Sequence, residues 1–224
     1  EVHTNNNQNQ MQLNDCNNNK YIDKRTGTGY VSASSNTMDF PILVVLITLV
    51  VTIIGGIFLV ASNPVDIMTK VVQEVSKFPT NKVIGSGTAL DTSRLRYQIG
   101  KYLEVSSKNI HAYIMGEHGD SSFVPWEHAY VGCKSMIDIM KDTGRSFSDL
   151  DKIYVEVRDS AYEIINRKKA TYYGIGLGLA RIVKNILNDT NEILTVSAYL
   201  NGEYGHKDIY IGMPAIINSN GARE

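Results

Sequence analysis

The sequence of 224 residues has only two cysteines and no excess of charge of either sign. Cys16 and Cys133 are too few and too far apart in sequence for a disulfide framework or a thiolate metal site, which fits a reducing, cytoplasmic location. With 22 basic and 23 acidic residues the net charge is −1, so no overall field favours nucleic acid or an acidic membrane surface. Any ligand site must therefore be local.

Two kinds of site also lack the spacing that they need. One cluster has the residue types that bind a metal ion, namely Glu117, His118, Asp120 and His128. It lacks the H-E-x-x-H spacing, so we reject it as a metal site. The segment "GIGLGLA" at residues 174–180 lies inside a helical pattern, and "GTG" at residues 27–29 lies in a polar tract without a preceding strand. Neither predicts a phosphate-binding turn, because such a turn links a strand to a helix N-terminus.

The front of the chain combines a polar tract with a hydrophobic stretch. The first twenty residues hold eight Asn and three Gln, which predicts a disordered polar tail over residues 1–39. Residues 40–65 carry no charge, and their apolar part has the length of about 20 residues that crosses a bilayer. The same stretch is rich in Val, Ile and Thr and contains Gly55 and Gly56, so it equally indicates two buried strands around a turn.

Downstream the hydrophobic pattern alternates between strands and helices, as in an α/β protein. Residues 57–61 predict a buried strand, and Asn63 followed by Pro64 predicts an N-cap with proline at the first helical position. The predicted helix presents one apolar stripe, formed by Val65, Met68, Val72 and Val75. An extended run at residues 82–84 follows, and the glycines of "GSGTALDTSRLRYQIGKYL" lead into a second helix.

The second half predicts a strand, two helices and a hairpin. The strand is "NIHAYIM", which leads into "GEHGD". The first helix has an apolar face of Ile153, Val157, Ala161, Ile164 and Ile165, and the second of Ile175, Leu179, Ile182, Val183, Ile186 and Leu187. Strand-like arms at residues 193–200 and 208–217 flank "NGEYGH", in which Asn201 and Gly202 are typical of a hairpin turn.

Three side chains form a chemically coherent set around His118. Gly119 lets the chain turn sharply and leaves the imidazole at the end of a strand, where α/β proteins place ligands. A neutral imidazole accepts a proton at about pH 7 when a carboxylate fixes its tautomer, and Asp91 is the candidate carboxylate. Arg94 follows Asp91 by one helical turn, so both can point the same way, and its planar guanidinium can bind a carboxylate ligand.

Each of these residues also has a structural interpretation. His118 could be a structural or solvated histidine, and Asp91 could cap its helix by accepting backbone N–H bonds. Arg94 and Asp91 could form no more than a solvated ion pair. The residues by themselves therefore predict at most an anion-binding acid–base site.

Five segments in one order carry a family resemblance: "IFLVASNPVDI", "VIGSGTALDTSRLR", "IMGEHGDSSFVPW", "KKATYYG" and "DIYIGMPAIIN". From about residue 56 to residue 224 the chain resembles bacterial-type L-lactate dehydrogenases of the lactate/malate dehydrogenase family. The resemblance implies an α/β protein, with the remnant of a doubly wound, parallel-sheet nucleotide domain followed by an α+β catalytic domain. It also implies NAD as cofactor, hydride transfer at C2 of lactate or pyruvate, and a cytoplasmic homo-oligomer that serves glycolysis and fermentation.

The resemblance assigns a role to each matching residue. His118 resembles the proton donor and acceptor at the substrate oxygen, Asp91 the carboxylate that fixes it, and Arg94 the clamp on the substrate carboxylate. The further matches are Asn63 near the nicotinamide and the substrate oxygen, Ser86 at the nicotinamide amide, Thr171 beside the substrate methyl group, and Arg96 with His111 at fructose 1,6-bisphosphate in allosteric members. Without the resemblance, the last two are an exposed arginine and a strand histidine.

The resemblance is incomplete at both ends. The glycine turn for the pyrophosphate, the acidic residue for the ribose and the mobile loop with its carbonyl-polarising arginine do not occur, and the chain stops where the family adds a strand and a long helix. We expect a disordered tail at residues 1–39, a hydrophobic segment with a nucleotide-domain remnant at 40–86, and a C-terminally truncated catalytic domain at 87–224. We also expect exposed apolar surface, weak or no binding of NAD, and little turnover.

Three alternatives remain open. The first is a single-pass membrane protein that spans from residue 40 to about residue 59 and carries a non-catalytic binding domain; it conflicts with a sheet strand at residues 57–61. The second is a related branched 2-hydroxy acid dehydrogenase, because "GEHGD" distinguishes lactate from malate enzymes but not from this relative. The third is a frameshifted gene product without activity.

Overall fold

The computed structural model describes residues 20–22, 29–31, 56–168 and 173–223, which fall into two units, residues 1–45 and 46–224. In the first unit, β1 (Lys20–Ile22) and β2 (Gly29–Val31) form an antiparallel pair with Tyr21 opposite Tyr30. These six residues form strands within residues 1–39, where we expected a disordered tail. The rest of that tail lies outside the described residues.

The second unit is built on a five-stranded mixed sheet in the order β10-β9-β8-β4-β3. The strands are β3 (Phe58–Val60), β4 (Val83–Gly85), β8 (Glu192–Asn201), β9 (Lys207–Asn218) and β10 (Gly221–Arg223). β3 and β4 are parallel, whereas β8, β9 and β10 form an antiparallel meander, which includes the predicted hairpin. β4 joins the two parts through the pair of Gly85 and Ser197, so the chain has the predicted α/β architecture.

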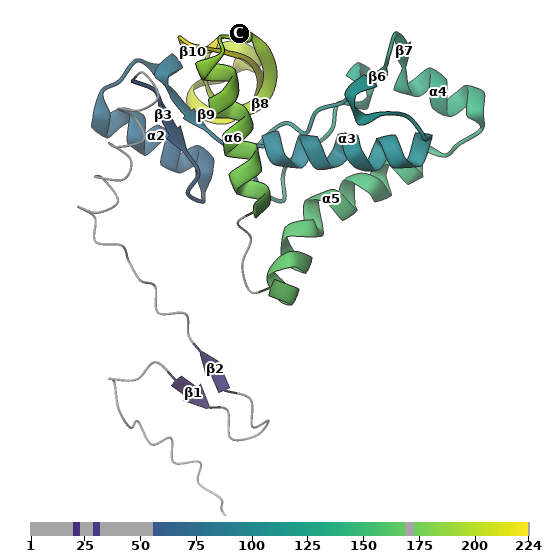
Figure 1. Cartoon of the computed structure of the whole chain (residues 1–224), viewed down its shortest axis with the longest axis horizontal. Helices are drawn as coiled ribbons and strands as arrows, with labels where there is room; N and C mark the ends of the chain where they lie inside the picture. Colours follow the sequence, from purple (N-terminus) through teal and green to yellow (C-terminus); the bar gives the residue numbers. More distant parts are fainter. Residues whose placement is uncertain (1–19, 23–28, 32–55, 169–172, 224) are drawn as a thin grey trace, which may run out of the picture. The chain divides into compact units, whose positions relative to one another are not determined.

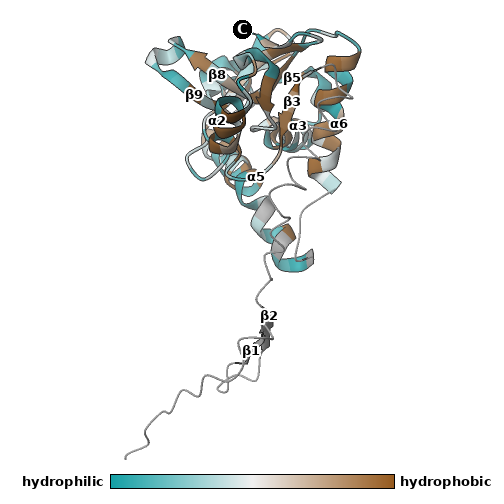
Figure 2. Ribbon diagram, turned by 90° about the vertical axis from the view of Figure 1, so that its left-hand side faces the viewer, coloured by the Kyte–Doolittle hydropathy of each residue, from teal (hydrophilic) through white to brown (hydrophobic). Residues whose placement is uncertain are grey.

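Helices cover both faces of this sheet. Figure 2 shows α2 (Val65–Ser76) and α6 (Tyr173–Leu187) on opposite sides of β3. The core under α6 includes Ile84, Ile182, Ile186, Val196 and Ile217, and the core under α2 includes Val60, Val83 and Tyr210 with Met68 and Val72. As predicted, "GIGLGLA" lies within α6 and forms no turn between a strand and a helix.

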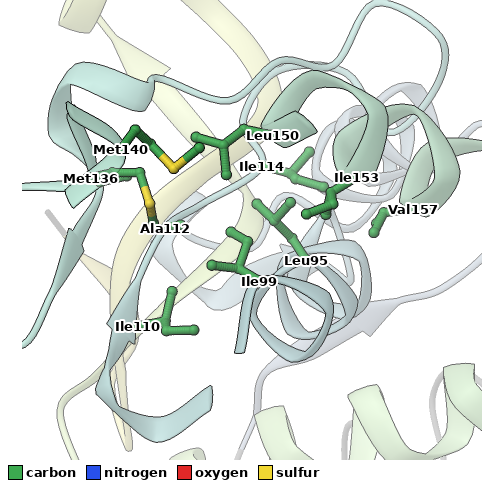
Figure 3. Packing of buried hydrophobic residues seen from close by; sticks show 11 residues of the cluster. Leu95, Ile99, Ile110, Ala112, Ile114, Met136, Met140, Leu150, Ile153 and Val157 are labelled. Atoms are coloured by element: carbon green, nitrogen blue, oxygen red, sulfur yellow. The ribbon is translucent and has the colours of Figure 1, made fainter. Parts of the chain in front are cut away.

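A second layer of packing surrounds α3 (Ala89–Leu103), which lies against α5 (Phe147–Lys168) in Figure 1. α4 (Met136–Thr143) and a three-stranded sheet of β5 (Ile110–His111), β6 (Tyr130–Val131) and β7 (Lys134–Ser135) complete this lobe. Four short 3₁₀ helices lie at Thr80–Lys82, Ser107–Asn109, Trp126–His128 and Glu203–Gly205. Figure 3 shows the core of the lobe, in which Leu95 and Ile99 of α3 contact side chains from α4, α5 and the strand region.

Several local predictions were wrong. Asn63 is not the N-cap of α2, because the cap is Pro64, whose ψ of 116° is extended, and the helix begins at Val65. Val75 does not belong to the buried stripe, since its side chain is 75% exposed. Leu187 is 62% exposed at the end of α6. The segment "NIHAYIM" forms only the two-residue strand β5 and, further on, an isolated bridge at Met115.

The edge of the sheet bears on the membrane alternative. Phe58–Val60 pairs with β4 as a sheet strand, so this end of the postulated span is not a lipid-buried helix. Most of the hydrophobic stretch, up to residue 55, lies outside the described residues. Among the residues that are described, no helix has the length and apolarity needed to cross a membrane.

Candidate active site

The start of α3 is fixed by the glycine turn that connects it to β4. A Cβ atom at Gly85 would lie 2.4 Å from Thr69 Oγ1, and one at Gly87 would lie 2.4 Å from the backbone nitrogen of Ser197. Gly87 also has a φ of +50°, which side chains rarely adopt. The two glycines therefore let β4 and the turn pack directly against α2 and β8, and this packing sets where the first turn of α3 begins.

Two threonines, one at the N-cap and one in the first turns of α3, position the chain that leads to His118. The Thr88 hydroxyl donates to the carbonyl oxygen of Ile114 at 2.6 Å, and the Thr92 hydroxyl oxygen accepts from the backbone N–H of Ile114 at 2.9 Å. Both threonines are buried, so these bonds replace water for the backbone groups of Ile114. They attach the segment before the loop to the helix that carries Asp91.

The loop that carries His118 is closed at its base by two short bridges. Gly116 and Gly212 exchange backbone hydrogen bonds of 2.8 and 3.0 Å, and Met115 and Phe123 exchange two of 2.9 Å. A Cβ atom at Gly212 would lie 2.6 Å from the Gly116 carbonyl oxygen, so glycine is required for this approach. His118 thus lies on a loop whose first end is bonded to β9 through Gly116 and whose second end is bonded back to Met115 through Phe123.

Asp91 links His118 and Arg94. Nδ1 of His118 lies 2.9 Å from Oδ2 of Asp91, and a guanidinium nitrogen of Arg94 lies 3.5 Å from Oδ1 of the same carboxylate. The side chains are 30%, 16% and 24% exposed for His118, Asp91 and Arg94, so the group is shielded from bulk water without being sealed. Because Nδ1 is engaged by Asp91, Nε2 is the ring nitrogen that remains available to a ligand.

The pKa of His118 is raised above its ordinary value. The hydrogen bond to Asp91 is the main cause, and the charges of Asp91 and Asp66 add to it, whereas burial and the charge of Arg94 act in the opposite direction. The protonated imidazole is therefore favoured in the folded chain. A group of this kind can donate a proton to an oxygen atom that becomes negatively charged.

This geometry decides between the interpretations of Asp91. α3 has Thr88 as its N-cap, and within the described residues the Asp91 side chain is engaged by His118 and Arg94 and not by the backbone N–H groups of its own helix. The contact with Arg94 is partly buried, so it is more than a solvated surface pair. The helix-cap interpretation of Asp91 therefore does not describe this structure.

The cavities divide the predicted site residues. His118 and Ser86 line one small cavity of about 30 Å³, together with Leu90 and side chains of α6. Arg94 lines a different cavity of about 380 Å³ between α3 and α5, which includes Glu156 and Ser160. His118 and Arg94 are thus joined through Asp91 but do not line the same cavity in this structure.

Two further predicted residues do not join this group. Asn63 is exposed and forms no hydrogen bond within the part of the chain that is described. Thr171 lies in the segment 169–172, outside the described residues. Gly174, at the start of α6, faces the site, since a Cβ atom there would lie 3.4 Å from the Arg94 guanidinium.

Arg96 and His111 line a third cavity, of about 680 Å³, on the other side of α3. Arg96 donates to the carbonyl oxygen of Ala112 at 3.0 Å, and its guanidinium lies 4.5 Å from the centre of the Tyr113 ring. Lys108 and Arg181 are further cations at this cavity, and Arg181 forms an ion pair with Glu192. Arg96 is half-buried and contacts Ala112 and Tyr113, so the interpretation of Arg96 as an exposed arginine is wrong. His111, by contrast, is exposed.

One residue at the site was missed by sequence reasoning. Asp66, in the first turn of α2, accepts a hydrogen bond of 3.0 Å from the backbone N–H of His118. It lies in the quoted motif "IFLVASNPVDI", but an acidic residue in the first turn of a helix is common, because it complements the helix dipole. Among the residues that the structure describes, no three His, Cys, Asp or Glu side chains gather as metal ligands.

Comparisons with known proteins agree with this architecture. Residues 88–224 match the family model described as lactate/malate dehydrogenase, alpha/beta C-terminal domain. L-lactate dehydrogenase 1 of Bacillus cereus is 55% identical over 170 residues, which cover 75% of this chain and 54% of that protein. L-lactate dehydrogenase 1 of Bacillus anthracis is also 55% identical over 170 residues, with the same coverage. The chain therefore spans about half the length of the curated relatives that it matches.

Solved structures give the same result. The minor L-lactate dehydrogenase from Enterococcus mundtii, in its ligands-bound form, is 44% identical with a TM-score of 0.74, over 87% of this chain and 65% of that chain. A lactate dehydrogenase from a Medee basin deep-sea metagenome library is 49% identical with a TM-score of 0.73, over 79% of this chain and 60% of that chain. The likeness extends across most of the described residues.

Proposed function

The chain belongs to the lactate/malate dehydrogenase family, and from this premise we propose that it carries the acid–base and substrate-binding part of an NAD-dependent L-lactate dehydrogenase. The observation that supports this most is the set formed by His118, Asp91 and Arg94, joined at distances of 2.9 and 3.5 Å. We assign residues 40–86 to a hydrophobic segment with part of the nucleotide domain, and residues 87–224 to the catalytic domain.

In this proposal His118 is the acid–base catalyst. During reduction of pyruvate, protonated His118 donates its Nε2 proton to the C2 oxygen, and during oxidation of lactate neutral His118 accepts the hydroxyl proton. Asp91 binds Nδ1, so it fixes the tautomer and stabilises the imidazolium cation. Arg94 binds the substrate carboxylate through its planar guanidinium, which orients C2 toward the imidazole. Thr171 borders the methyl group of the substrate.

Among the described residues, those that we assign to NAD lie at its nicotinamide end. Asn63 and Ser86 are the residues that we assign to the nicotinamide, and NAD, when bound, supplies or accepts the hydride at C2. The cavity shared by Ser86 and His118, at about 30 Å³, is too small for a ring, so a ligand has to contact the exposed side of the imidazole. The glycines of the β4–α3 turn are required for close packing, so they do not indicate a pyrophosphate cradle.

We assign the third cavity to an anionic effector. Arg96, Lys108 and Arg181 supply positive charge around a volume of about 680 Å³, which His111 and Glu192 also line. Phosphate groups are bound by clustered cations of this kind, and guanidinium groups can bind them with two hydrogen bonds. This supports a phosphorylated effector such as fructose 1,6-bisphosphate. On the family resemblance alone, we also propose that the chain acts as a homo-oligomer in the cytoplasm. The chemistry of the site leaves a branched 2-hydroxy acid as a second candidate substrate.

The proposal is tested by pyruvate binding and turnover in the 224-residue chain. We expect pyruvate to shift the ring signals of His118 in NMR spectra, and Arg94→Lys to weaken this binding about tenfold or more, because a point charge replaces a two-bond clamp. Where pyruvate-dependent oxidation of NADH is measurable at saturating NADH, we expect His118→Asn to lower kcat by about 10²-fold to 10⁴-fold.

A matched control separates the clamp from a general charge effect. Arg145→Lys removes another guanidinium, which lies 5.0 Å from the Tyr102 ring on the far side of the lobe, and should leave pyruvate binding unchanged. Equal loss of pyruvate binding in both variants would contradict a specific clamp. An unshifted His118 signal at saturating pyruvate, or unchanged binding in Arg94→Lys, would overturn the proposed substrate site.

A further inference from the structure

His118 is held by two helices, and only one of them carries Asp91. The second contact comes from α2, where Oδ2 of Asp66 accepts the backbone N–H of His118 at 3.0 Å across 52 residues of sequence. Asp66 lies in the first turn of α2, and the positive end of the helix dipole stabilises a carboxylate there. The contact reaches the main chain of His118, whereas Asp91 reaches the ring.

The partial burial of Asp66 costs more free energy than the exposure of a surface carboxylate. Its other oxygen, Oδ1, is buried and has no hydrogen-bond partner among the described residues, and the same holds for the hydroxyl of Ser197, a fully buried residue. Burial raises the pKa of Asp66, while the Ser197 hydroxyl and the backbone N–H and charge of His118 lower it. A partly buried carboxylate with an unsatisfied oxygen is destabilising unless it makes a compensating contact. Among the described residues the Asp66 carboxylate accepts a hydrogen bond only from the His118 N–H. The Ser197 hydroxyl lowers the pKa of Asp66 without meeting the geometry of a hydrogen bond.

We propose that Asp66 is a positioning residue for His118, which fixes the main chain of the loop from α2 while Asp91 fixes the imidazole from α3. This inference rests on the proposed function in one respect, namely that His118 is the acid–base group. Held at the main chain and at Nδ1, the imidazole has little freedom to turn, so Nε2 stays directed to one place. A fixed catalytic group of this kind avoids the cost of ordering it for each turnover.

The charges around His118 give Asp66 a second effect. Asp91 and Arg94 face the imidazole from α3, and Asp66 faces it from α2, while Glu117 of the same loop acts on Asp66. Two carboxylates and one guanidinium therefore surround the ring, and both carboxylates favour its protonated form. Asp66 thus contributes to the position of His118 through a hydrogen bond and to its proton affinity through charge, and these two effects can be separated.

The test is an NMR titration of His118 in the 224-residue chain, with the ring signal assigned from its loss in His118→Gln. Asp66→Asn keeps an oxygen that accepts the His118 N–H but removes the charge, and Asp66→Ala removes both. We expect the pKa of His118 to fall in both variants, and slow exchange of the His118 amide proton to persist in Asp66→Asn but to be lost in Asp66→Ala. Glu74→Gln, which removes an exposed carboxylate from the same helix, should change neither quantity.

Each outcome decides the proposal. An unchanged His118 titration in Asp66→Asn, together with unchanged amide exchange in Asp66→Ala, would overturn the inference. Asp66 would then only stabilise the N-terminus of α2. If Asp66→Ala does not fold, Asp66→Asn still decides it through the titration, and Asp66→Ser, which lacks both the charge and the reach, replaces the alanine variant. A shifted titration without any binding of pyruvate would retain the positioning role and reject the proposed substrate, so the two failures are distinguishable.

Discussion

The two helices that hold His118 differ in how completely they are buried. α3 contributes Leu95 and Ile99, both with no exposed surface, to a core closed by α4, α5 and the small sheet. α2 covers one face of the main sheet but leaves Ile67 and Val75 at 63% and 75% exposed, beside β3 at the edge of the sheet. Asp91 thus lies on a helix that contributes fully buried side chains to a closed core, although its Tyr97 is exposed, and Asp66 lies on a helix with two largely exposed aliphatic side chains.

Because of this difference, the site residues on α3 are held by closer packing than those on α2 and at the end of β3. Residues on α3 keep their positions because the helix cannot shift without disrupting a close-packed core. Residues on α2 and at the end of β3 depend on fewer neighbours, and the exposed apolar side chains of α2 agree with the exposed surface that the sequence predicts for this region. The ring contact to Asp91 should therefore tolerate perturbation of α2, while the main-chain contact to Asp66 should not.

The largest expected effect comes from opening the core under α3. Leu95→Ala should lower the free energy of unfolding by about 3 kcal/mol, because it removes buried methyl groups and leaves a cavity. Val75→Ala on α2 should change it by less than about 0.5 kcal/mol, because that side chain is mostly in water. Urea unfolding of both variants measures the contrast. Equal losses would mean that the two helices do not differ in burial in solution.

A smaller, pH-dependent effect is expected from Asp91→Asn. The folded pKa of His118 is raised chiefly by its hydrogen bond to Asp91, so the protonated ring stabilises the fold. This contribution is complete below the unfolded pKa of about 6.5 and is lost as pH rises through the raised folded pKa. The variant should therefore be less stable than the parent by about 1 kcal/mol at acid pH, and less so at alkaline pH.

Thermal unfolding of the parent and Asp91→Asn between about pH 5.5 and pH 8.5 measures this difference. A constant remainder is expected at all pH values in this range, because the variant also loses the charge that faces Arg94. The same scan on Glu74→Gln serves as a control without a histidine partner. A difference that grows with rising pH would reverse the sign of the linkage and contradict the contact between Asp91 and His118.

Much of the architecture was predictable from the sequence, because it depends on hydrophobic period and on turn residues. The hairpin of β8 and β9, the helix α3 and the short strand β3 each follow from such local signals. The exposed ends of the helices were not predictable, since the pattern of Val65, Met68, Val72 and Val75 does not reveal where the sheet under α2 ends. The N-cap at Asn63 failed for a local reason, namely the extended backbone of Pro64.

The site was predictable only in part. Asp91 and Arg94 are one helical turn apart, so their proximity follows from sequence, and the contact of Asp91 with His118 was expected from chemistry and from the family resemblance. The contact of Asp66 with His118 was not, because it joins a side chain to a backbone N–H 52 residues away, and backbone donors carry no signal in a sequence. The separate cavity of Arg94 depends on how α3 packs on α5, which local patterns do not determine.

The ring tautomer of His118 tests the central claim most directly. If Asp91 binds Nδ1, neutral His118 at alkaline pH carries its proton on Nδ1 and leaves Nε2 unprotonated, and nitrogen-15 NMR of the imidazole distinguishes the two forms. We expect the Nδ1–H form in the parent chain and no preference for it in Asp91→Ala. A neutral ring protonated at Nε2 in the parent chain would contradict it, because Nε2, the nitrogen that Asp91 leaves available, would already carry a proton and could not accept one from a bound hydroxy acid.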